Sequence, residues 1–315
     1  MDSLKEEKIN TTIKDNMGGL DSRFKRKVFI LNLILVISVF ILLYFYLFSS
    51  PLSNKDVTLH FGTDDSLSKI STELKARNVI RNSFLLKTFL YTLSFDKHIQ
   101  SGDYLFKRNK NLFSITLQIL RGVHNVEKIK VTLREGITNN EFANILADKI
   151  PSFRKDLFLA DKRSKEGYLF PDTYFFYPLS TTDEILNELT LNFNNKINSV
   201  RSEIDKSGKS IKDIIIMASI LEKEAAGKED IYIISGILWK RIKLNMPLQV
   251  DAYVKTYKEA GLPNEPICNP GLVAINAAIN PTQSSYLFYL HDDNGRVHYA
   301  IDFSEHRSNI ARYLK

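Results

Sequence analysis

Cysteine is almost absent from this sequence of 315 residues, since Cys268 is the only one. A single cysteine excludes an intramolecular disulfide and a thiolate metal cluster. The sequence also lacks the P-loop, the H-E-x-x-H zinc motif and the G-x-S-x-G element of serine hydrolases. These nucleotide-hydrolysing, zinc-dependent and serine-dependent enzyme classes are therefore not indicated, and we expect no metal site.

Recognition motifs for nucleic acids are missing as well. The chain carries 43 Lys and Arg against 36 Asp and Glu, a formal net charge of +7, but it has no zinc-finger spacing, RNP-type aromatic motif or long basic helix. A basic balance also suits an anionic membrane surface or an acidic polymer. We therefore expect no nucleic-acid partner.

Charged residues are absent from 28–48, which reads VFILNLILVISVFILLYFYLF. A helix of this length rises about 30 Å, enough to cross the hydrocarbon core of a membrane. Arg23 and the run at 25–27 are basic, whereas 49–54 carry no charge, so the positive-inside rule predicts a cytoplasmic tail over 1–27. Everything beyond the linker at 49–56 would lie outside the cytoplasmic membrane. A cleaved signal peptide is the alternative, but its apolar region is usually shorter and ends in small residues rather than aromatic ones.

Two folded units are expected after the linker. The first, residues 57–124, has strand patterns at 57–61 and 102–106 and helical patterns at 66–78, 83–93 and 113–121. The second, residues 125–315, has strand patterns at 128–133, 286–290 and 297–301 and helical patterns at 138–149, 182–205, 211–226 and 230–243. Thr138 with Glu141 forms a capping-box pattern at the start of the first of these helices, and a turn signal at 292–295 joins the last two strands. Helices and strands alternate without βαβ regularity, so the predicted fold class is α+β.

The helix predicted over 211–227, IKDIIIMASILEKEAAG, has the strongest chemical signal. Glu222 shares a helical stripe with the apolar residues 211, 215, 218 and 225, where a core residue is expected. Burial raises the pKa of a carboxyl group, which is what a general acid near neutral pH needs. Two alternatives stay open from periodicity alone. Glu222 could pair with a basic residue and only hold helices together, or Glu224 could be the acid instead.

Short blocks of characteristic sequence follow one another through the second unit. They read EGYLFPDTY at 166–174, ASILEKE at 218–224, MPLQ at 246–249, GLP at 261–263, NPG at 269–271 and NP at 280–281. Each block alone is weak, but the ordered set, which covers roughly 128–315, resembles the endolytic murein transglycosylase family (MltG, or YceG-like). The anchor and a small LysM-like module before a YceG-like catalytic domain also match the layout of that family.

The resemblance implies a lytic transglycosylase that cuts the bond between N-acetylmuramic acid and N-acetylglucosamine in peptidoglycan glycan strands. Glu222 occupies the position of the family's catalytic glutamate. It would protonate the glycosidic oxygen and then act as base on the muramic C6 hydroxyl, closing a 1,6-anhydro ring without water. The resemblance implies no metal or organic cofactor. An enzyme of this kind would trim or end nascent strands, and the peptidoglycan synthases would then be its partners.

Six further residues match the family's cleft, and the resemblance implies that they bind sugar or position the glutamate. They are Glu166, Asp172, Thr173, Tyr174, Gln249 and Asp251. Structural alternatives stay open for parts of this set. The block at 171–173 could be a turn in which Asp172 bonds local backbone, the aromatic residues at 170–176 could be core, and the block at 269–271 could simply start a helix.

The segment after Gln249 departs from the family pattern. The usual polar-Asp-Pro-Thr run reads VDAY at 250–253, a following Tyr-Asn-Thr-Tyr block is missing, and Arg134 replaces the proline before the Glu-Gly pair at 135–136. These changes leave two other functions open. One is a membrane-anchored scaffold that binds peptidoglycan without cutting it. The other is a hydrolytic muramidase that uses Glu222 with a second acid such as Glu166 or Asp251.

Overall fold

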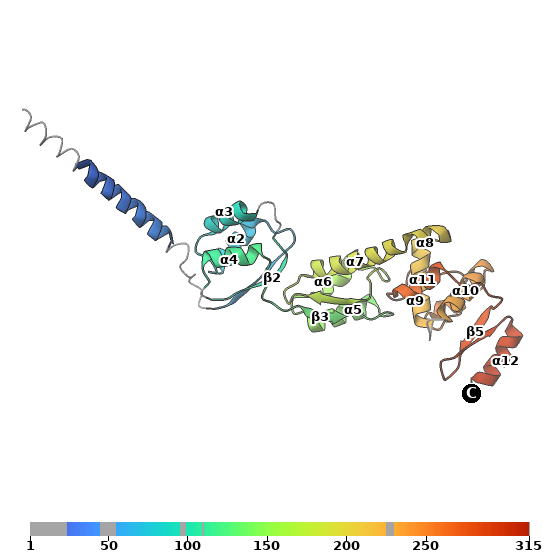
Figure 1. Cartoon of the computed structure of the whole chain (residues 1–315). Coiled ribbons are helices and arrows are strands. Elements are labelled where there is room, and N and C mark those ends of the chain that lie inside the picture. Colours follow the sequence, from blue (N-terminus) through green and yellow to red (C-terminus); the bar gives the residue numbers. More distant parts are fainter. Residues whose placement is uncertain (1–23, 45–54, 95–98, 109, 225–229, 315) are drawn as a thin grey trace, which may run out of the picture. The chain divides into compact units, whose positions relative to one another are not determined.

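The computed structural model describes residues 24–44, 55–94, 99–108, 110–224 and 230–314 (Figure 1). The chain has a mixed α+β fold, as predicted, and divides into two compact units, Met1–Asn125 and Val126–Lys315. Most of the predicted tail, most of the linker and the last residues of the predicted anchor lie outside the described residues.

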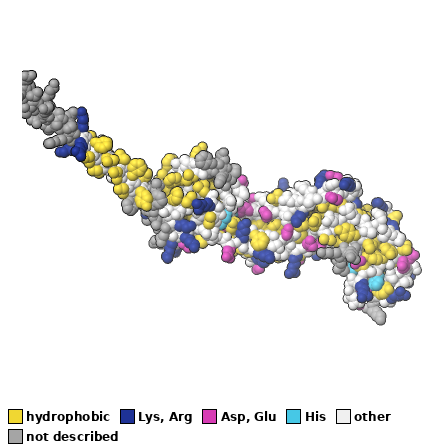
Figure 2. All heavy atoms as spheres, in the orientation of Figure 1, with side chains coloured by type: hydrophobic (Ala, Val, Ile, Leu, Met, Phe, Trp, Pro, Cys, Tyr) yellow, Lys and Arg dark blue, Asp and Glu magenta, His cyan; other side chains and the backbone are white. Residues whose placement is uncertain are grey.

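An apolar helix spans Phe24–Tyr44 and is long enough to cross a membrane. Figure 2 shows hydrophobic side chains along its length and basic side chains at its N-terminal end. The most apolar part of this helix is not buried against any other described residue, as expected for a helix that is surrounded by lipid. This finding is compatible with the predicted anchor, and the orientation of the anchor stays a prediction.

The first unit is built on a two-stranded antiparallel sheet. Strand β1 (Val57–Phe61) pairs with β2 (Gly102–Phe106), and helices α2 (Leu67–Ala76), α3 (Ser83–Ser94) and α4 (Leu112–Leu120) complete the unit. Helices α2 and α4 begin where a side chain caps them, Ser66 accepting from Lys69 N and Asn111 from Ser114 N. Buried residues from all five elements form one core. The predicted strands and helices of this unit are confirmed, and its LysM-like character stays a prediction.

The second unit begins with a second antiparallel pair covered by helices. Strand β3 (Ile129–Thr132) pairs with β4 (Thr173–Phe176), and α5 (Asn139–Lys149), α6 (Lys155–Ala160) and α7 (Thr182–Ser199) surround a core of its own. The capping box that the sequence predicts between Thr138 and Glu141 opens α5. Two expectations were wrong here. The match to the family implied that Thr173 and Tyr174 lie in a loop of the cleft, but they belong to β4. The helix expected over 182–205 ends at Ser199, so that α8 (Arg201–Ser207) is separate.

The rest of the second unit is organised around helix α9 (Ile211–Glu224). Helices α10 (Asp230–Lys243) and α11 (Leu272–Ile279) lie against it (Figure 1), and a short 3₁₀ turn, η1, covers Val254–Tyr257. The chain then forms the predicted hairpin of β5 (Phe288–His291) and β6 (Val297–Ala300), followed by α12 (Phe303–Tyr313), which the sequence analysis missed. The eight residues Ile214–Leu221 are all buried, so α9 is enclosed on every side, as its apolar run predicts.

Candidate active site

Glu222 follows directly after the buried run of α9. Its side chain is half-buried, and its Oε2 accepts a hydrogen bond of 2.8 Å from the backbone N–H of Gly271, at the start of α11. Burial raises the pKa of the Glu222 carboxyl, the Gly271 N–H opposes this shift, and the neighbouring carboxylate of Glu135 adds to it. The site therefore holds a carboxyl group that favours its protonated form more than a free glutamate does.

A second carboxylate, that of Glu135, lies beside Glu222. A Cβ atom placed on Gly271 would lie 1.8 Å from Oε1 of Glu135, so that this oxygen rests against the Gly271 backbone. The Gly271 N–H is also the donor to Glu222. Together with standard bond lengths, these contacts leave the two carboxyl groups no more than about 8 Å apart. The sequence analysis missed Glu135, although it lies in the Glu-Gly pair that was part of the family pattern.

Asn269 joins the three segments that surround this carboxyl pair. Its side chain is fully buried, and its Oδ1 accepts from the backbone N–H groups of Gly167 and Leu169, at 3.1 and 3.2 Å. Its Nδ2 faces Ile137 O, Asn139 Oδ1 and Glu166 Oε1, at 3.1, 2.7 and 3.2 Å. The backbone of Asn269 also bonds the turn at 136–137, since its N–H donates to Ile137 O and its C=O accepts from the Gly136 N–H. Asn269 therefore fixes the turn that carries Glu135 and the segment that leads to Gly271.

Glu166 is part of the network around Asn269. Its carboxylate accepts from the backbone N–H of Asn139, at 3.1 Å to each oxygen, as well as from Asn269. Burial is the largest cause of a raised pKa at this group. The contacts support the predicted role of positioning the glutamate, through Asn269. Neither of its hydrogen-bond partners is a basic group.

Gln249 and Asp251 line a cavity of about 440 Å³ on another side of the α9 terminus. Glu224 belongs to the same cavity, where its carboxylate accepts from the Tyr289 hydroxyl at 3.0 Å. Asp251 accepts from the Tyr257 hydroxyl. Gln249 has a positive φ of 52°, which is uncommon for a residue with a side chain and is frequent near functional sites. The two acids at the end of α9 therefore face different surroundings, and Glu222 is not in the lining of this cavity.

The remaining predicted residues have structural partners in the first half of the unit. Tyr174 is buried in the core beside β3, and its hydroxyl donates to Phe170 O at 2.6 Å. The Thr173 hydroxyl bonds the hydroxyl of Thr132 across the sheet. Asp172 accepts from the Thr173 N–H, as the turn interpretation expects. A role of these three residues in binding sugar stays a prediction.

Cys268 is fully buried, and burial raises the pKa of its thiol to about 12, so that it stays protonated. Within the described ranges, no three His, Cys, Asp or Glu side chains lie close enough to hold a metal ion.

Comparisons with known proteins show the family of the chain. The model of the YceG-like family matches residues 59–255 and 253–312. The chain is 27% identical to the endolytic murein transglycosylase of Bacillus subtilis, over 83% of this chain and 86% of that protein. It is 24% identical to the endolytic murein transglycosylase of Streptococcus pneumoniae, over 83% of this chain but 59% of that longer protein. The crystal structure of a YceG-like protein from Listeria monocytogenes covers 81% of this chain at 26% identity, with a TM-score of 0.53.

Proposed function

The chain belongs to the YceG-like family, and from this membership and the Glu222 site we propose that it is an endolytic murein transglycosylase. Its relatives from Bacillus subtilis and Streptococcus pneumoniae carry that name. The substrate would be the glycan strand of peptidoglycan. The observation that carries the proposal is the half-buried Glu222 carboxyl, held by Gly271 at the point where three segments of the unit meet.

Glu222 is the proposed acid and base of the reaction. With its pKa raised by burial, a larger share of the carboxyl is protonated near neutral pH, as protonation of the glycosidic oxygen requires. The carboxylate that remains would then remove the proton from the muramic C6 hydroxyl, which attacks C1 and closes the 1,6-anhydro ring. The Gly271 N–H stabilises the ionised form of Glu222 between the two steps.

Glu135 favours one alternative, a hydrolytic muramidase. Hydrolytic glycosidases place two carboxyl groups about 5 to 9.5 Å apart, and the Glu135–Glu222 pair is compatible with that range. In the lyase, Glu135 would instead keep Glu222 protonated and stabilise positive charge at C1. The two reactions differ in their product, since only the lyase gives 1,6-anhydro ends.

The apolar helix and the first unit support a proposed location for the protein at the cytoplasmic membrane. We propose that Phe24–Tyr44 belongs to an uncleaved anchor in the cytoplasmic membrane, with both folded units outside it. The first unit would act as a LysM-like glycan-binding module. Both would keep the active site close to newly made strands and to the synthases that extend them.

Product analysis tests the proposal. The full chain, purified in detergent, is incubated with isolated peptidoglycan beside the variants Glu222→Gln, Glu224→Gln and the exposed control Glu203→Gln. We expect 1,6-anhydro-muramic ends by mass spectrometry from the wild type and from both Glu224→Gln and Glu203→Gln. Loss of one positioned acid/base group lowers rates by about 100- to 10,000-fold, so the Glu222→Gln variant should give almost none.

Three outcomes would contradict it. Reducing ends without the anhydro ring would identify a hydrolase. Loss of product from Glu224→Gln but not from Glu222→Gln would show that Glu224, and not Glu222, is the acid. A folded wild type that binds peptidoglycan but releases nothing would indicate the non-catalytic scaffold.

A further inference from the structure

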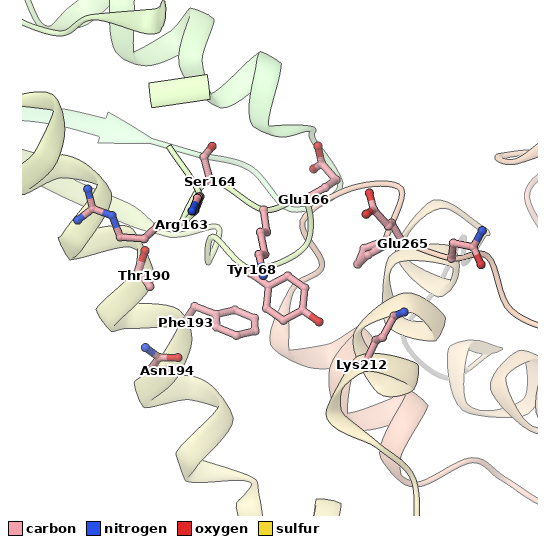
Figure 3. A pocket seen from close by; sticks show the side chains of 13 residues that line it. Arg163, Ser164, Glu166, Tyr168, Thr190, Phe193, Asn194, Lys212 and Glu265 are labelled. Carbon is pink, nitrogen blue, oxygen red and sulfur yellow. The ribbon is translucent and has the colours of Figure 1, made fainter. Parts of the chain in front are cut away.

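A second cavity, of about 750 Å³, lies next to the Asn269 network (Figure 3). It is lined by the segment 162–168, by one face of α7, by Lys212 near the start of α9 and by 264–266. Glu166 belongs both to this lining and to the network, because its carboxylate accepts from Asn269. The cavity has no part in the chemistry proposed for Glu222.

Two aromatic rings form an apolar part of the lining. Tyr168 and Phe193 pack with their ring centroids 5.2 Å apart and their planes at 55°. Figure 3 shows the Tyr168 hydroxyl directed toward the side of the cavity that carries Lys212. Burial raises the pKa of this hydroxyl, so that it remains a hydrogen-bond donor. The Oγ of Ser164, also in the lining, is buried and has no hydrogen-bond partner within the described part of the chain.

The rim of the cavity is rich in ammonium groups. Lys162, Lys165 and Lys212 are exposed, and none of them forms an ion pair with another described residue. Arg163 differs, because Asp161 and Asp183 hold its guanidinium at 2.7 and 2.6 Å. Two carboxyl groups oppose these lysines, Glu265 and Glu166, and burial disfavours the charged form of Glu166. The surplus of positive charge beside aromatic rings and amide side chains suits an acidic ligand with amide groups.

We infer that this cavity, the lysine pocket, binds the acidic peptide attached to the muramic acid of the strand that is held at Glu222. The inference rests on the proposed function, since it takes the glycan strand as substrate. Muramic acid carries its peptide on the lactyl group, and free carboxylates along that peptide would meet the lysines. Its amide groups would meet the Tyr168 hydroxyl and the Asn194 side chain.

The distance from Glu222 fits a peptide of this kind. Glu166 lines the pocket and bonds Asn269, and Gly271, two residues further on, donates to Glu222. With standard bond lengths, this path leaves the Glu166 and Glu222 carboxyl groups no more than about 16 Å apart. An extended peptide of three to five residues spans about 10 to 18 Å. One substrate molecule can therefore reach both sites.

Substrates with and without peptides test the inference. The full chain in detergent is given glycan strands that carry their peptides, or the same strands after the peptides have been removed enzymatically. The variant Lys165→Gln/Lys212→Gln is compared with Lys130→Gln/Lys206→Gln, a control pair of exposed lysines outside the pocket. We expect the pocket variant to raise KM for peptide-bearing strands about 2- to 30-fold, as for two exposed ion pairs. Its kcat, and its KM for peptide-free strands, should match those of the control.

Added salt is a second readout. The KM of the wild type for peptide-bearing strands should rise with ionic strength more steeply than that of the pocket variant, because exposed ion pairs are screened. Equal effects on the two kinds of strand, or no effect on either, would overturn the inference. So would competition by polyglycerol phosphate but not by a free acidic tetrapeptide, which would assign the pocket to a phosphate polymer.

Binding separates failure of the inference from failure of the proposed function. The dissociation constant of the same strands is measured with Glu222→Gln alone and with Glu222→Gln combined with the pocket substitutions. If the wild type makes no anhydro ends while the peptide-dependent difference in binding persists, the lyase proposal fails and the peptide site stands. If anhydro ends form but binding ignores the peptide, the inference fails alone.

Discussion

Asn269 gives the sharpest test of how the active site is held together. We consider its replacement by alanine, which removes the amide group and leaves the backbone able to adopt the same conformation. The change leaves the N–H groups of Gly167 and Leu169 without their acceptor, which is Asn269 Oδ1. It also takes a donor from Ile137 O and from the Asn139–Glu166 pair. The amide has two hydrogens, so four hydrogen bonds are lost at once.

The cost follows from the burial of these groups. A buried donor or acceptor without a partner costs about 1 to 3 kcal/mol, and a water molecule entering the vacated space would offset part of the loss. For Asn269→Ala we therefore expect about 3 to 5 kcal/mol less free energy of unfolding, and a Tm lower by roughly 6 to 20 °C. We also expect a lower kcat, since Gly271 would no longer be held against Glu222.

Urea unfolding of the full chain in detergent measures this effect on one unit. Trp239 is the only tryptophan of the chain and lies in α10, where its Nε1 donates to Ala278 O, so its fluorescence reports the second unit. The exposed Asn198→Ala is the matched control and should stay within about 0.5 kcal/mol of the wild type. A loss below about 1 kcal/mol for Asn269→Ala, with kcat unchanged, would refute the reasoning.

Three further predictions concern the carboxyl pair and one helix contact. Glu135→Gln removes a negative neighbour that raises the pKa of Glu222, so the alkaline limb of the pH–kcat profile should move to lower pH; an unchanged profile would exclude this coupling. The pKa of Glu222 is higher in the folded state than in the unfolded state. Glu222 therefore lowers stability once the pH exceeds its unfolded pKa, and the loss is complete above its folded pKa. The advantage of Glu222→Gln in urea stability should therefore grow as pH rises from about 4 to 7, and a constant difference would contradict this sign. Gly236→Ala would put a Cβ 1.9 Å from Thr282 O, so thermal unfolding should show a free energy of unfolding lower by about 1 to 3 kcal/mol. An unchanged stability would mean that α10 can move aside.

Elements with a local signal could be predicted from the sequence, and those with only distant partners could not. The capping box at Thr138 and the apolar run of α9 lie within single helices, and both predictions are confirmed. Strand β4 was missed because its partner, β3, lies some forty residues earlier, and because its aromatic residues suit a core or a sugar site equally well. Helix α12 was missed although its sequence is amphipathic, and none of its residues is buried.

The α7–α8 break has no sequence signal of the usual kind. Val200 stands between the two helices with φ −114° and ψ 16°, and neither Gly nor Pro marks the position. Helix propensity extends across it, so a single helix was the natural expectation, and tertiary packing decides otherwise. The buried Ile197 and Ile204 on either side belong to the same core as α9.

The same division between local and distant information holds for the active site. Periodicity indicated Glu222, because a carboxyl on an otherwise apolar stripe is visible within one helix, but it left Glu224 open, and the family resemblance chose between the two. The chemistry that we propose for Glu222 depends on groups that lie far apart in the sequence, since Glu135 follows β3 and Asn269 precedes α11. Nothing in the spacing of these residues indicates that they meet. The block at 269–271 was expected to start a helix, and it does, but the buried side chain of Asn269 also joins two other segments.

Two glycines lie beside the two carboxyl groups and have different roles. Gly136 has φ +78°, which favours glycine, and a Cβ there would only make an ordinary contact with Cγ of Glu222, at 3.4 Å, so it is the turn that requires this glycine. Gly271 has an ordinary extended conformation, and what requires a glycine there is space, since a Cβ would overlap Glu135. The negative charge of Glu135 adds to the effect of burial in raising the pKa of Glu222, and repulsion between the two groups costs stability when both are ionised. Gly271 therefore permits an arrangement that stability alone would not favour, as expected for the acid catalyst that we propose.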